Sequence, residues 1–145
     1  MTSHAGDTNE EYLLDEQVGY LMRLASQRHA AIFQAHTVSG LTPTQFSALI
    51  RLSEQGTCSQ NQLGRLASMD VATIKGVVDR LRQKGLVAVK KDPDDKRRAL
   101  ISLTDARSPM SADMRAAGQR ITAETLKPLS TTEARSLVRL LKKIS

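Results

Sequence analysis

The sequence has few aromatic residues, one cysteine and no long hydrophobic run. Phe, Trp and Tyr make up 3% of its 145 residues, and Trp is absent. RNA-binding modules are expected to stack bases on aromatic side chains, so this scarcity counts against that class. The single cysteine, Cys58, excludes an intramolecular disulfide. We find no apolar run long enough to span a bilayer and no signal peptide, so no membrane partner is expected.

Positive charge, by contrast, is concentrated in one part of the chain. Residues 75–98 hold nine Lys or Arg and four Asp, a net charge of +5 within a chain of +6. Residues 1–20 hold five acidic side chains and no Lys or Arg, and residues 1–11 are expected to be disordered. Such local clustering favours DNA as the partner over a membrane surface. The alternative for a charge run alone is a solvated hairpin.

The basic cluster lies within residues 69–104, which are predicted to form a helix, a strand, a charged turn and a second strand. Asp70 is a suitable N-cap and Gly85 a suitable C′ residue. One apolar helix face is expected from residues at helical spacing: Val71, Ile74, Val78 and Leu81. The runs 86–89 and 99–103 are β-prone. A helix followed by a basic two-stranded ribbon can fill a DNA major groove and reach the adjacent minor groove.

This segment resembles the winged helix-turn-helix of the MarR family of bacterial transcription regulators. The matching pieces are Asp79-Arg80-Leu81, Lys84-Gly85-Leu86-Val87, Asp95-Lys96-Arg97 and Leu103-Thr104. A looser similarity extends over most of residues 12–145. The resemblance implies a triangular dimer held by the N- and C-terminal helices. The simplest location for such a protein is the bacterial cytoplasm, on the nucleoid.

The fold is therefore predicted to be mainly α, with a small two-stranded β wing. Residues 41–103 should form the winged DNA-binding unit, and residues 12–40 and 104–145 a helical dimerisation region. A long helix is expected from about Leu13 to Val38, with one apolar stripe. Further helices should begin at three capping boxes: Thr42–Gln45, Ser59–Gln62 and Ser130–Glu133. The terminal helices are too elongated to bury their apolar faces on the central unit, which favours a homodimer.

Pro109 leaves two possibilities for the helical region that follows the wing. A helix that starts at Thr104 would place this proline at its fifth position, where it would remove a needed N–H and kink the helix. Alternatively, the helix restarts with Ser108 as N-cap and Pro109 at the first position.

The expected function is sequence-specific binding to a pseudo-palindromic duplex by a dimeric regulator, most simply a repressor. Thr73, Lys75 and Gly76 lie on the exposed N-terminal half of the recognition helix, where base edges are read. Many MarR relatives have an arginine at the position of Gly76, so their base contacts cannot be copied here. The other expected DNA contacts come from the preceding helix, the end of the recognition helix and the wing: Gln60, Asn61, Arg82, Lys96, Arg97 and Arg98.

An effector site is predicted where the first helix meets the winged unit. The stretch Gln17–Arg23 followed by Gln27-Arg28-His29 looks like the first helix of relatives that regulate the catabolism of aromatic acids. An aromatic acid or its thioester would be recognised by cationic or hydrogen-bonding groups and apolar walls: Arg23, Arg28, His29, His36, Phe46 and Ile50. The alternative is that these histidines are structural, satisfied side chains at a domain junction.

The residues give less support for a metal site, a redox site or an enzyme active site. His29 and His36 are about 10 Å apart along one helix, too far to share a metal ion, so no metal or cofactor is expected. Cys58 stands at a hydrophobic-staple position and is predicted to be buried rather than a redox sensor. No phosphate loop or nucleophile–base pair indicates an enzyme. A MarR-type regulator with a non-aromatic, metal or redox signal stays an alternative, as does a small-molecule-binding protein or enzyme without a DNA role.

Overall fold

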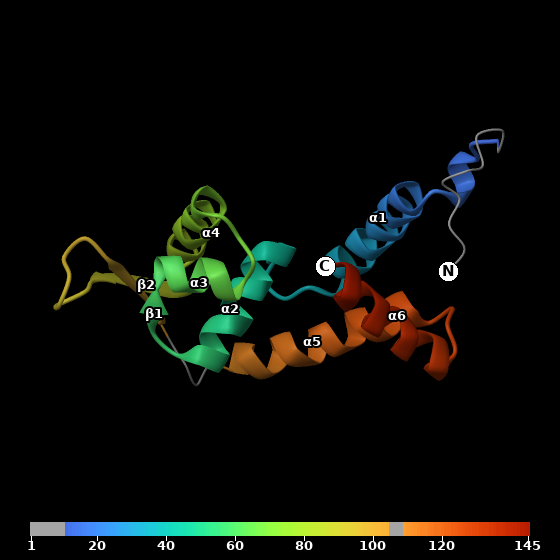
Figure 1. The fold of residues 1–145 in the computed structure, drawn as a ribbon. Helices are drawn as coiled ribbons and strands as arrows, with labels where there is room; N and C mark the ends of the chain where they lie inside the picture. The colour runs from blue at the N-terminus through green and yellow to red at the C-terminus, as the bar shows by residue number, and fades with distance from the viewer. Residues whose placement is uncertain (1–10, 105–108) are drawn as a thin grey trace.

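The computed structural model describes residues 11–104 and 109–145, and these form a mainly helical chain with a small sheet at one end (Figure 1). A single 3-10 turn, η1, precedes the first α-helix. The elements in chain order are η1 Leu14–Glu16, α1 Val18–His36, α2 Pro43–Gln55, β1 Cys58–Ser59, α3 Gln60–Leu66, α4 Val71–Gln83, β2 Val87–Lys91, β3 Ala99–Leu103, α5 Pro109–Leu126 and α6 Thr131–Ile144. The predicted class, mainly α with a β wing, is confirmed.

Side-chain caps fix the beginnings of α2, α3 and α6. At α2 and α6 the full capping box forms: Thr42 exchanges bonds with Gln45, and Ser130 with Glu133. Before α3, the Ser59 hydroxyl accepts from the Gln62 N–H at 3.1 Å, which is the first half of the predicted box. Each cap satisfies backbone N–H groups that the helix itself cannot. Local sequence therefore determines where these helices start.

The sheet contains one strand more than the sequence predicted. Its order is β1-β3-β2, with both pairs antiparallel and with Cys58 opposite Ile101 and Val87 opposite Leu103. The predicted strand 86–89 is displaced to Val87–Lys91, whereas Ala99–Leu103 is as predicted. β1 is only two residues long, too short to show the alternation by which a strand is recognised. It ties the start of α3 to the base of the wing.

One hydrophobic core fills the space between α2, α3, α4 and the sheet. Its fully buried side chains are Leu41, Leu52, Leu63, Ile74, Val78, Leu81 and Ile101. Met114 from α5 joins the same cluster, so α5 is anchored to this unit at its N-terminal end. Cys58 is buried in the cluster, as predicted. Within α2, however, Phe46 and Ile50 are only half-buried, because the core is filled by Ala48, Leu49 and Leu52 instead.

The terminal helices lie at the other end of the molecule. In Figure 1, α5 runs away from the winged end towards α6, and α1 projects at the same side. Of the predicted apolar stripe of α1, only Phe33 is buried within the single chain. Large apolar side chains on these helices are exposed: Val18, Leu21, Met22, Leu24, Val138, Leu140, Leu141 and Ile144. None of the described helices is long and apolar enough to cross a membrane.

The predicted start of the first helix is wrong. The first helix begins at Val18 rather than near Leu13, because Gln17 has an extended backbone that separates η1 from α1. It also ends at His36 rather than Val38. After the wing, Thr104 is a bend and not helical, and α5 begins at Pro109. The alternative with Pro109 at the first helical position is therefore confirmed, whereas Ser108 lies outside the described residues.

Val71 also departs from the prediction. The buried face of α4 consists of Ile74, Val77, Val78 and Leu81. Val71 was expected on this face but is 69% exposed, because at the first position of the helix it extends beyond the elements that cover the following turns.

Candidate functional site

A tight turn joins α3 to α4. Ser68 adopts a left-handed conformation with φ of 55°, and the Met69 N–H donates to the Gly64 carbonyl at 2.8 Å. A Cβ on Gly64 would lie 3.1 Å from both the Met69 carbonyl oxygen and the Ile74 Cγ2. Gly64 therefore permits the close approach of the two helices. This helix-turn-helix geometry holds α4 at a fixed angle on the surface.

Asp70 caps the exposed end of α4. Its carboxylate accepts the Thr73 N–H at 2.7 Å. This backbone bond, together with a bond from the Thr73 side chain, lowers the pKa of Asp70 below its ordinary value. A lowered carboxyl pKa means that the stabilisation is complete above the ordinary value and is lost as the pH falls through the lowered one. The cap is therefore ionised at neutral pH, next to the positive end of the helix dipole.

The outward face of α4 carries the residues predicted to read DNA. Thr73, Lys75 and Arg82 are exposed, and Gly76 is half-buried. The Lys75 ammonium bonds to the Asp79 carboxylate at 3.0 Å, one turn further along the helix. Both partners are more than half exposed, so this pair stabilises the helix only slightly and can open.

The wing between β2 and β3 presents arginine side chains on a turn that its own aspartates organise. Asp95 accepts the Arg97 backbone N–H at 3.0 Å and its Nε–H at 3.3 Å. Asp92, which is mostly buried, accepts the Asp94 N–H and pairs with Arg98 at 3.5 Å. The Arg97 side chain is nevertheless 92% exposed. Its pairing with Asp95 is therefore weak, and the guanidinium is accessible to a partner.

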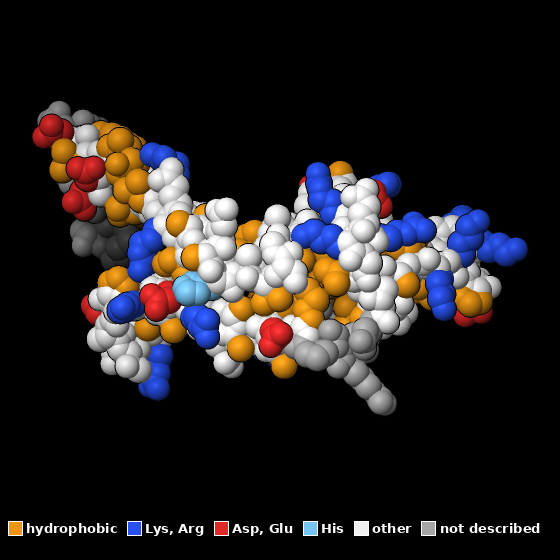
Figure 2. Space-filling model, turned by 180° about the vertical axis from the view of Figure 1, so that it is seen from behind, with side chains coloured by type: hydrophobic (Ala, Val, Ile, Leu, Met, Phe, Trp, Pro, Cys, Tyr) orange, Lys and Arg blue, Asp and Glu red, His pale blue; other side chains and the backbone are white. Residues whose placement is uncertain are grey.

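A polar groove of about 370 Å³ separates the wing from α3. It is lined by Ser59, Gln60, Asn61, Gln62, Arg65, Arg97, Arg98 and Ala99. The structure thus brings predicted residues of α3 and of the wing together, and adds Arg65, which the sequence analysis missed. Arg65 could have been suspected from its position one turn after the capped start of α3. Lys and Arg side chains gather towards this end of the molecule in Figure 2.

The predicted effector residues do not form one cluster. Arg28 donates to the carbonyl oxygens of Thr125 at 2.7 Å and Glu124 at 3.0 Å, at the last turn of α5. The Thr125 hydroxyl donates to Ile121, so His29 Nδ1 is the donor of its 2.9 Å bond to that hydroxyl. Cations favour the carbonyl end of a helix. Arg28 and His29 therefore already have protein partners, and no ligand is needed to satisfy them.

The other two residues predicted on α1 lie apart from this joint. The Arg23 guanidinium lies 5.4 Å from the centre of the Tyr20 ring, a cation–π contact on an exposed part of the helix. His36 is half-buried in the last turn of α1. Among residues 11–104 and 109–145, no three His, Cys, Asp or Glu side chains are grouped to hold a metal ion.

Phe46 and Ile50 line an open groove of about 580 Å³ between α2 and α5. Its other walls are Met114, Arg115, Gly118, Gln119, Thr122 and Ala123. The groove combines an apolar side with a cation, Arg115, whose Nη2 donates to Ser53 at 2.8 Å. The edge of Phe33 packs against Phe46 with ring centres 5.4 Å apart, and His29 lies 6.4 Å from Phe33. A chain of rings thus connects this groove to the joint between α1 and α5.

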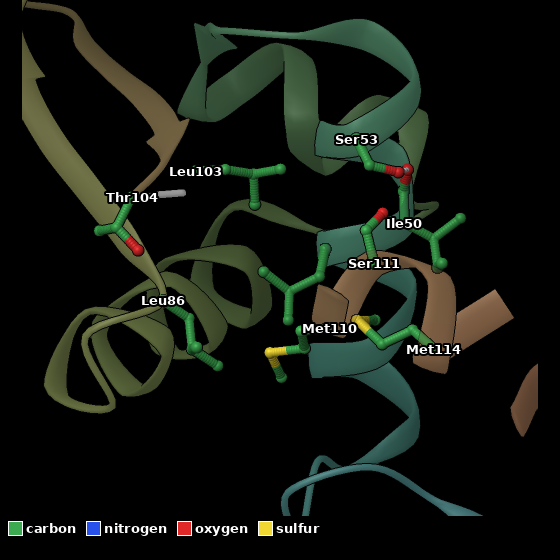
Figure 3. Close-up of a pocket in the computed structure, with 9 residues that line it drawn as sticks. Ile50, Ser53, Leu86, Leu103, Thr104, Met110, Ser111 and Met114 are labelled. Carbon is green, nitrogen blue, oxygen red and sulfur yellow. Dashed lines mark hydrogen bonds between the residues drawn. The ribbon is translucent and has the colours of Figure 1, made fainter. Parts of the chain in front are cut away.

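A smaller cavity of about 170 Å³ lies at the base of the wing (Figure 3). Ile50, Leu86, Leu103, Met110 and Met114 surround it, with the hydroxyls of Ser53, Thr104 and Ser111 at its edges. It has no charged lining residue, and it is smaller than the usual 300–1,000 Å³ of small-molecule sites. The open groove is the larger of the two, and it carries a cation, Arg115.

Cys58 shows no sign of a reactive thiol. It is buried in the core, and burial raises the pKa of its thiol above the ordinary value. A raised pKa lowers the fraction of thiolate, the form that reacts with oxidants.

Comparison with known proteins agrees with the helix-turn-helix and wing. The family model described as MarR family matches residues 41–99. The chain is 36% identical to the transcriptional repressor NicR of Pseudomonas putida, across 94% of this chain and 87% of that protein.

Two solved structures have the same fold. A probable transcriptional regulator from Pseudomonas aeruginosa superimposes with a TM-score of 0.87 and 49% identity, covering 92% of this chain and all of that one. Bordetella bronchiseptica BpsR, whose DNA binding is regulated by 6-hydroxynicotinic acid, gives a TM-score of 0.85 and 39% identity, with 93% and 97% covered. The chain therefore belongs to the MarR family of transcriptional regulators.

Proposed function

We propose that this regulator is a homodimeric repressor that binds a pseudo-palindromic operator and is released by a small aromatic acid. Residues 41–103 would form the DNA-binding unit, and residues 12–40 and 104–145 the dimerisation region. The observation that carries the DNA-binding role is the groove in which Gln60 and Asn61 lie beside Arg97 and Arg98. It places hydrogen-bond donors and exposed cations on one surface, as contact with a phosphate backbone requires.

Each part of this surface has a proposed role in DNA binding. α4 enters the major groove with Thr73, Lys75 and Gly76 at its leading end, and Arg82 and the α3 residues contact phosphates. The wing reaches the adjacent minor groove with Arg97, while Lys96 and Arg98 neutralise backbone charge. The wing can reach outwards in this way because Arg97 is almost fully exposed at the end of a two-stranded ribbon.

The exposed apolar faces of α1 and α6 support the homodimer. Val18 is 62% and Ile144 65% exposed, and Leu21 on α1 and Leu141 on α6 are exposed with them. Figure 2 shows hydrophobic side chains along the α1 arm, at the end opposite the wing. A second copy that covers these faces also presents two recognition helices about one DNA turn apart, roughly 34–36 Å.

The DNA-binding proposal is tested with the full-length protein and duplexes selected from a random library. We expect a dimer at micromolar concentration, two related half-sites about one turn apart and an affinity that falls steeply with salt. Sedimentation and fluorescence anisotropy at several salt concentrations measure these properties. A monomer whose binding does not depend on salt or sequence would refute the proposal.

The effector part of the proposal rests on the groove between α2 and α5. Phe46 and Ile50 offer an apolar wall for a ring, and Arg115 a cation for a carboxylate. Because the regulation of BpsR involves 6-hydroxynicotinic acid, that compound is the first probe, followed by other aromatic carboxylates and their thioesters. Of the residues predicted on α1, Arg28 and His29 bond to the end of α5 and would transmit a change caused by the ligand to α1. Arg23 and His36 lie apart from this joint and would respond only through α1 itself.

Release from the operator requires that the ligand bind more tightly to the dimer geometry that does not fit DNA. A ligand with equal affinity for both geometries would not change the equilibrium between them. Arg28→Ala and His29→Ala should blunt release by the aromatic acid while ligand-free operator binding is nearly intact. Arg120→Ala, an exposed arginine on the same helix as Thr125, is the matched control and should respond as the wild type. If the Arg28 and His29 variants are released as readily as the control, these residues are structural only.

A further inference from the structure

The first residue of the recognition helix is an exposed valine. Val71 is 69% exposed, although the next apolar residues of α4 are buried. It follows the cap Asp70 directly, and so lies at the N-terminal end of the helix. In a helix-turn-helix, the N-terminal residues of the second helix are the ones that contact base edges. An apolar side chain therefore occupies a position from which a residue is expected to contact a base edge.

The neighbours of Val71 offer few free hydrogen-bonding groups. Ala72 is exposed and Gly76 half-buried, and neither has a polar side chain. The Asp70 carboxylate accepts the Thr73 backbone N–H, and the Lys75 ammonium bonds to Asp79 at 3.0 Å. The start of α4 thus presents the methyl groups of Val71 and Ala72 beside the polar side chains of Thr73 and Lys75.

The major groove contains one apolar group that such a surface can recognise. Thymine carries a C5-methyl group there, whereas cytosine and the purines carry no methyl group at their groove edges. We infer that Val71, with Ala72 beside it, contacts the C5-methyl group of a thymine and so requires a thymine in each half-site. This inference rests on the proposed operator binding.

The cations of the same winged unit favour nucleic acid as the partner. The groove between α3 and the wing carries Arg65, Arg97 and Arg98. A protein partner for the apolar group would also have to match this cluster of cations, whereas duplex DNA provides phosphates on both sides of the major groove. The phosphate contacts would fix the register, and the methyl contact would specify a base.

The test replaces thymine by deoxyuridine, which pairs in the same way but lacks the methyl group. Thymines of one half-site in the best duplex selected by the full-length protein are replaced one at a time, and affinity is measured by anisotropy. One or two positions should lose about fourfold, which corresponds to about 0.8 kcal/mol for one buried methyl group at 1.4 kcal/mol per tenfold. Other thymines should have no effect.

Protein variants then assign the lost contact to its residue. Val71→Ala should bind the thymine duplex more weakly and distinguish it from the deoxyuridine duplex by less than twofold, whereas Val71→Ile should keep the distinction. Thr44→Ala, at an exposed β-branched residue on α2, is the matched control and should keep the wild-type ratio between the two duplexes. Circular dichroism checks that α4 stays folded in each variant.

Different results would overturn the methyl contact and the operator binding on which it rests. If a duplex is selected but no thymine-to-deoxyuridine change matters, or if Val71→Ala keeps the wild-type ratio, the methyl contact is overturned and operator binding stands. If no duplex is selected at all, the proposed function and this inference fall together.

Discussion

The winged unit, residues 41–103, and the two arms, α1 and α6, bury apolar side chains in different ways. The winged unit places its large apolar residues in a core whose central members are fully buried. The arms carry large apolar side chains that are exposed, and among their described residues only Phe33 is buried. The winged unit can therefore be stable within one chain, whereas the arms need a partner to remove their apolar surface from water.

The largest difference should come from the same substitution made in each region. Leu63 is fully buried, so Leu63→Ala should lower the free energy of unfolding by about 2–5 kcal/mol at every protein concentration. Leu141 is exposed in the single chain, so Leu141→Ala should raise the dimer dissociation constant and lower the unfolding midpoint more at low protein concentration than at high. Denaturant titrations at two protein concentrations separate the outcomes. If the unfolding midpoints of both variants depend on protein concentration in the same way, the winged unit and the arms do not differ in their need for a partner.

A second prediction concerns two glycines of the helix-turn-helix. Gly64→Ala should destabilise the winged unit by about 1–3 kcal/mol, because its Cβ would lie 3.1 Å from the Met69 carbonyl oxygen. Gly76→Ala is the matched control. There the nearest atom is Arg80 Nη1 at 3.7 Å, and alanine should stabilise the helix by about 0.5–1 kcal/mol. Thermal unfolding measures both, and the same sign for the two variants would contradict the packing argument.

A third prediction separates DNA contact from assembly. Arg97→Ala should weaken operator binding by about 1–3 kcal/mol with little change in folding, because this side chain is 92% exposed and its pairing with Asp95 is weak. Arg139→Ala, an exposed arginine on α6, should leave operator affinity unchanged. Anisotropy at near-physiological salt gives both values. If the Arg97 variant binds the operator with unaltered affinity, Arg97 is a solvated surface residue that does not contact DNA.

The smallest effect is expected at the turn before α4. Ser68 has a φ of 55°, which costs an L-residue energy that glycine avoids. Ser68→Gly should therefore stabilise the winged unit by about 0.5–1 kcal/mol. Ser47→Gly, within α2, should instead destabilise it by a similar amount because glycine is unfavourable inside helices. Chemical denaturation tests the pair, and destabilisation by Ser68→Gly would show that the turn is not strained.

The same contrast between regions explains what the sequence predicts and what it does not. The caps at Thr42, Asp70 and Ser130 depend on side chains within three residues, so they can be read directly from the chain. The exposure of Val71, by contrast, depends on which distant elements cover it. The sequence gives its helical phase but not its surroundings.

The candidate effector residues show this limit more clearly. The partners of Arg28 lie at Glu124 and Thr125, almost a hundred positions along the chain, and no local pattern indicates them. Phe46 and Ile50 were predicted from their place on α2, but their companion Arg115 was not, because only the packing of α5 brings it to the groove. The effector that fits there stays a prediction.

The bonds from Arg28 and His29 to the end of α5 make that helix a lever. Its 18 residues correspond to a length of about 27 Å at 1.5 Å per residue. A tilt of about 5° at the Thr125 end would move the other end by about 2 Å, more than the tolerance of a hydrogen bond. That other end is anchored in the core of the winged unit through Met114. A small tilt of α5 at the arms would thus displace the whole winged unit. A small ligand that causes such a tilt could therefore separate the recognition helix from the operator.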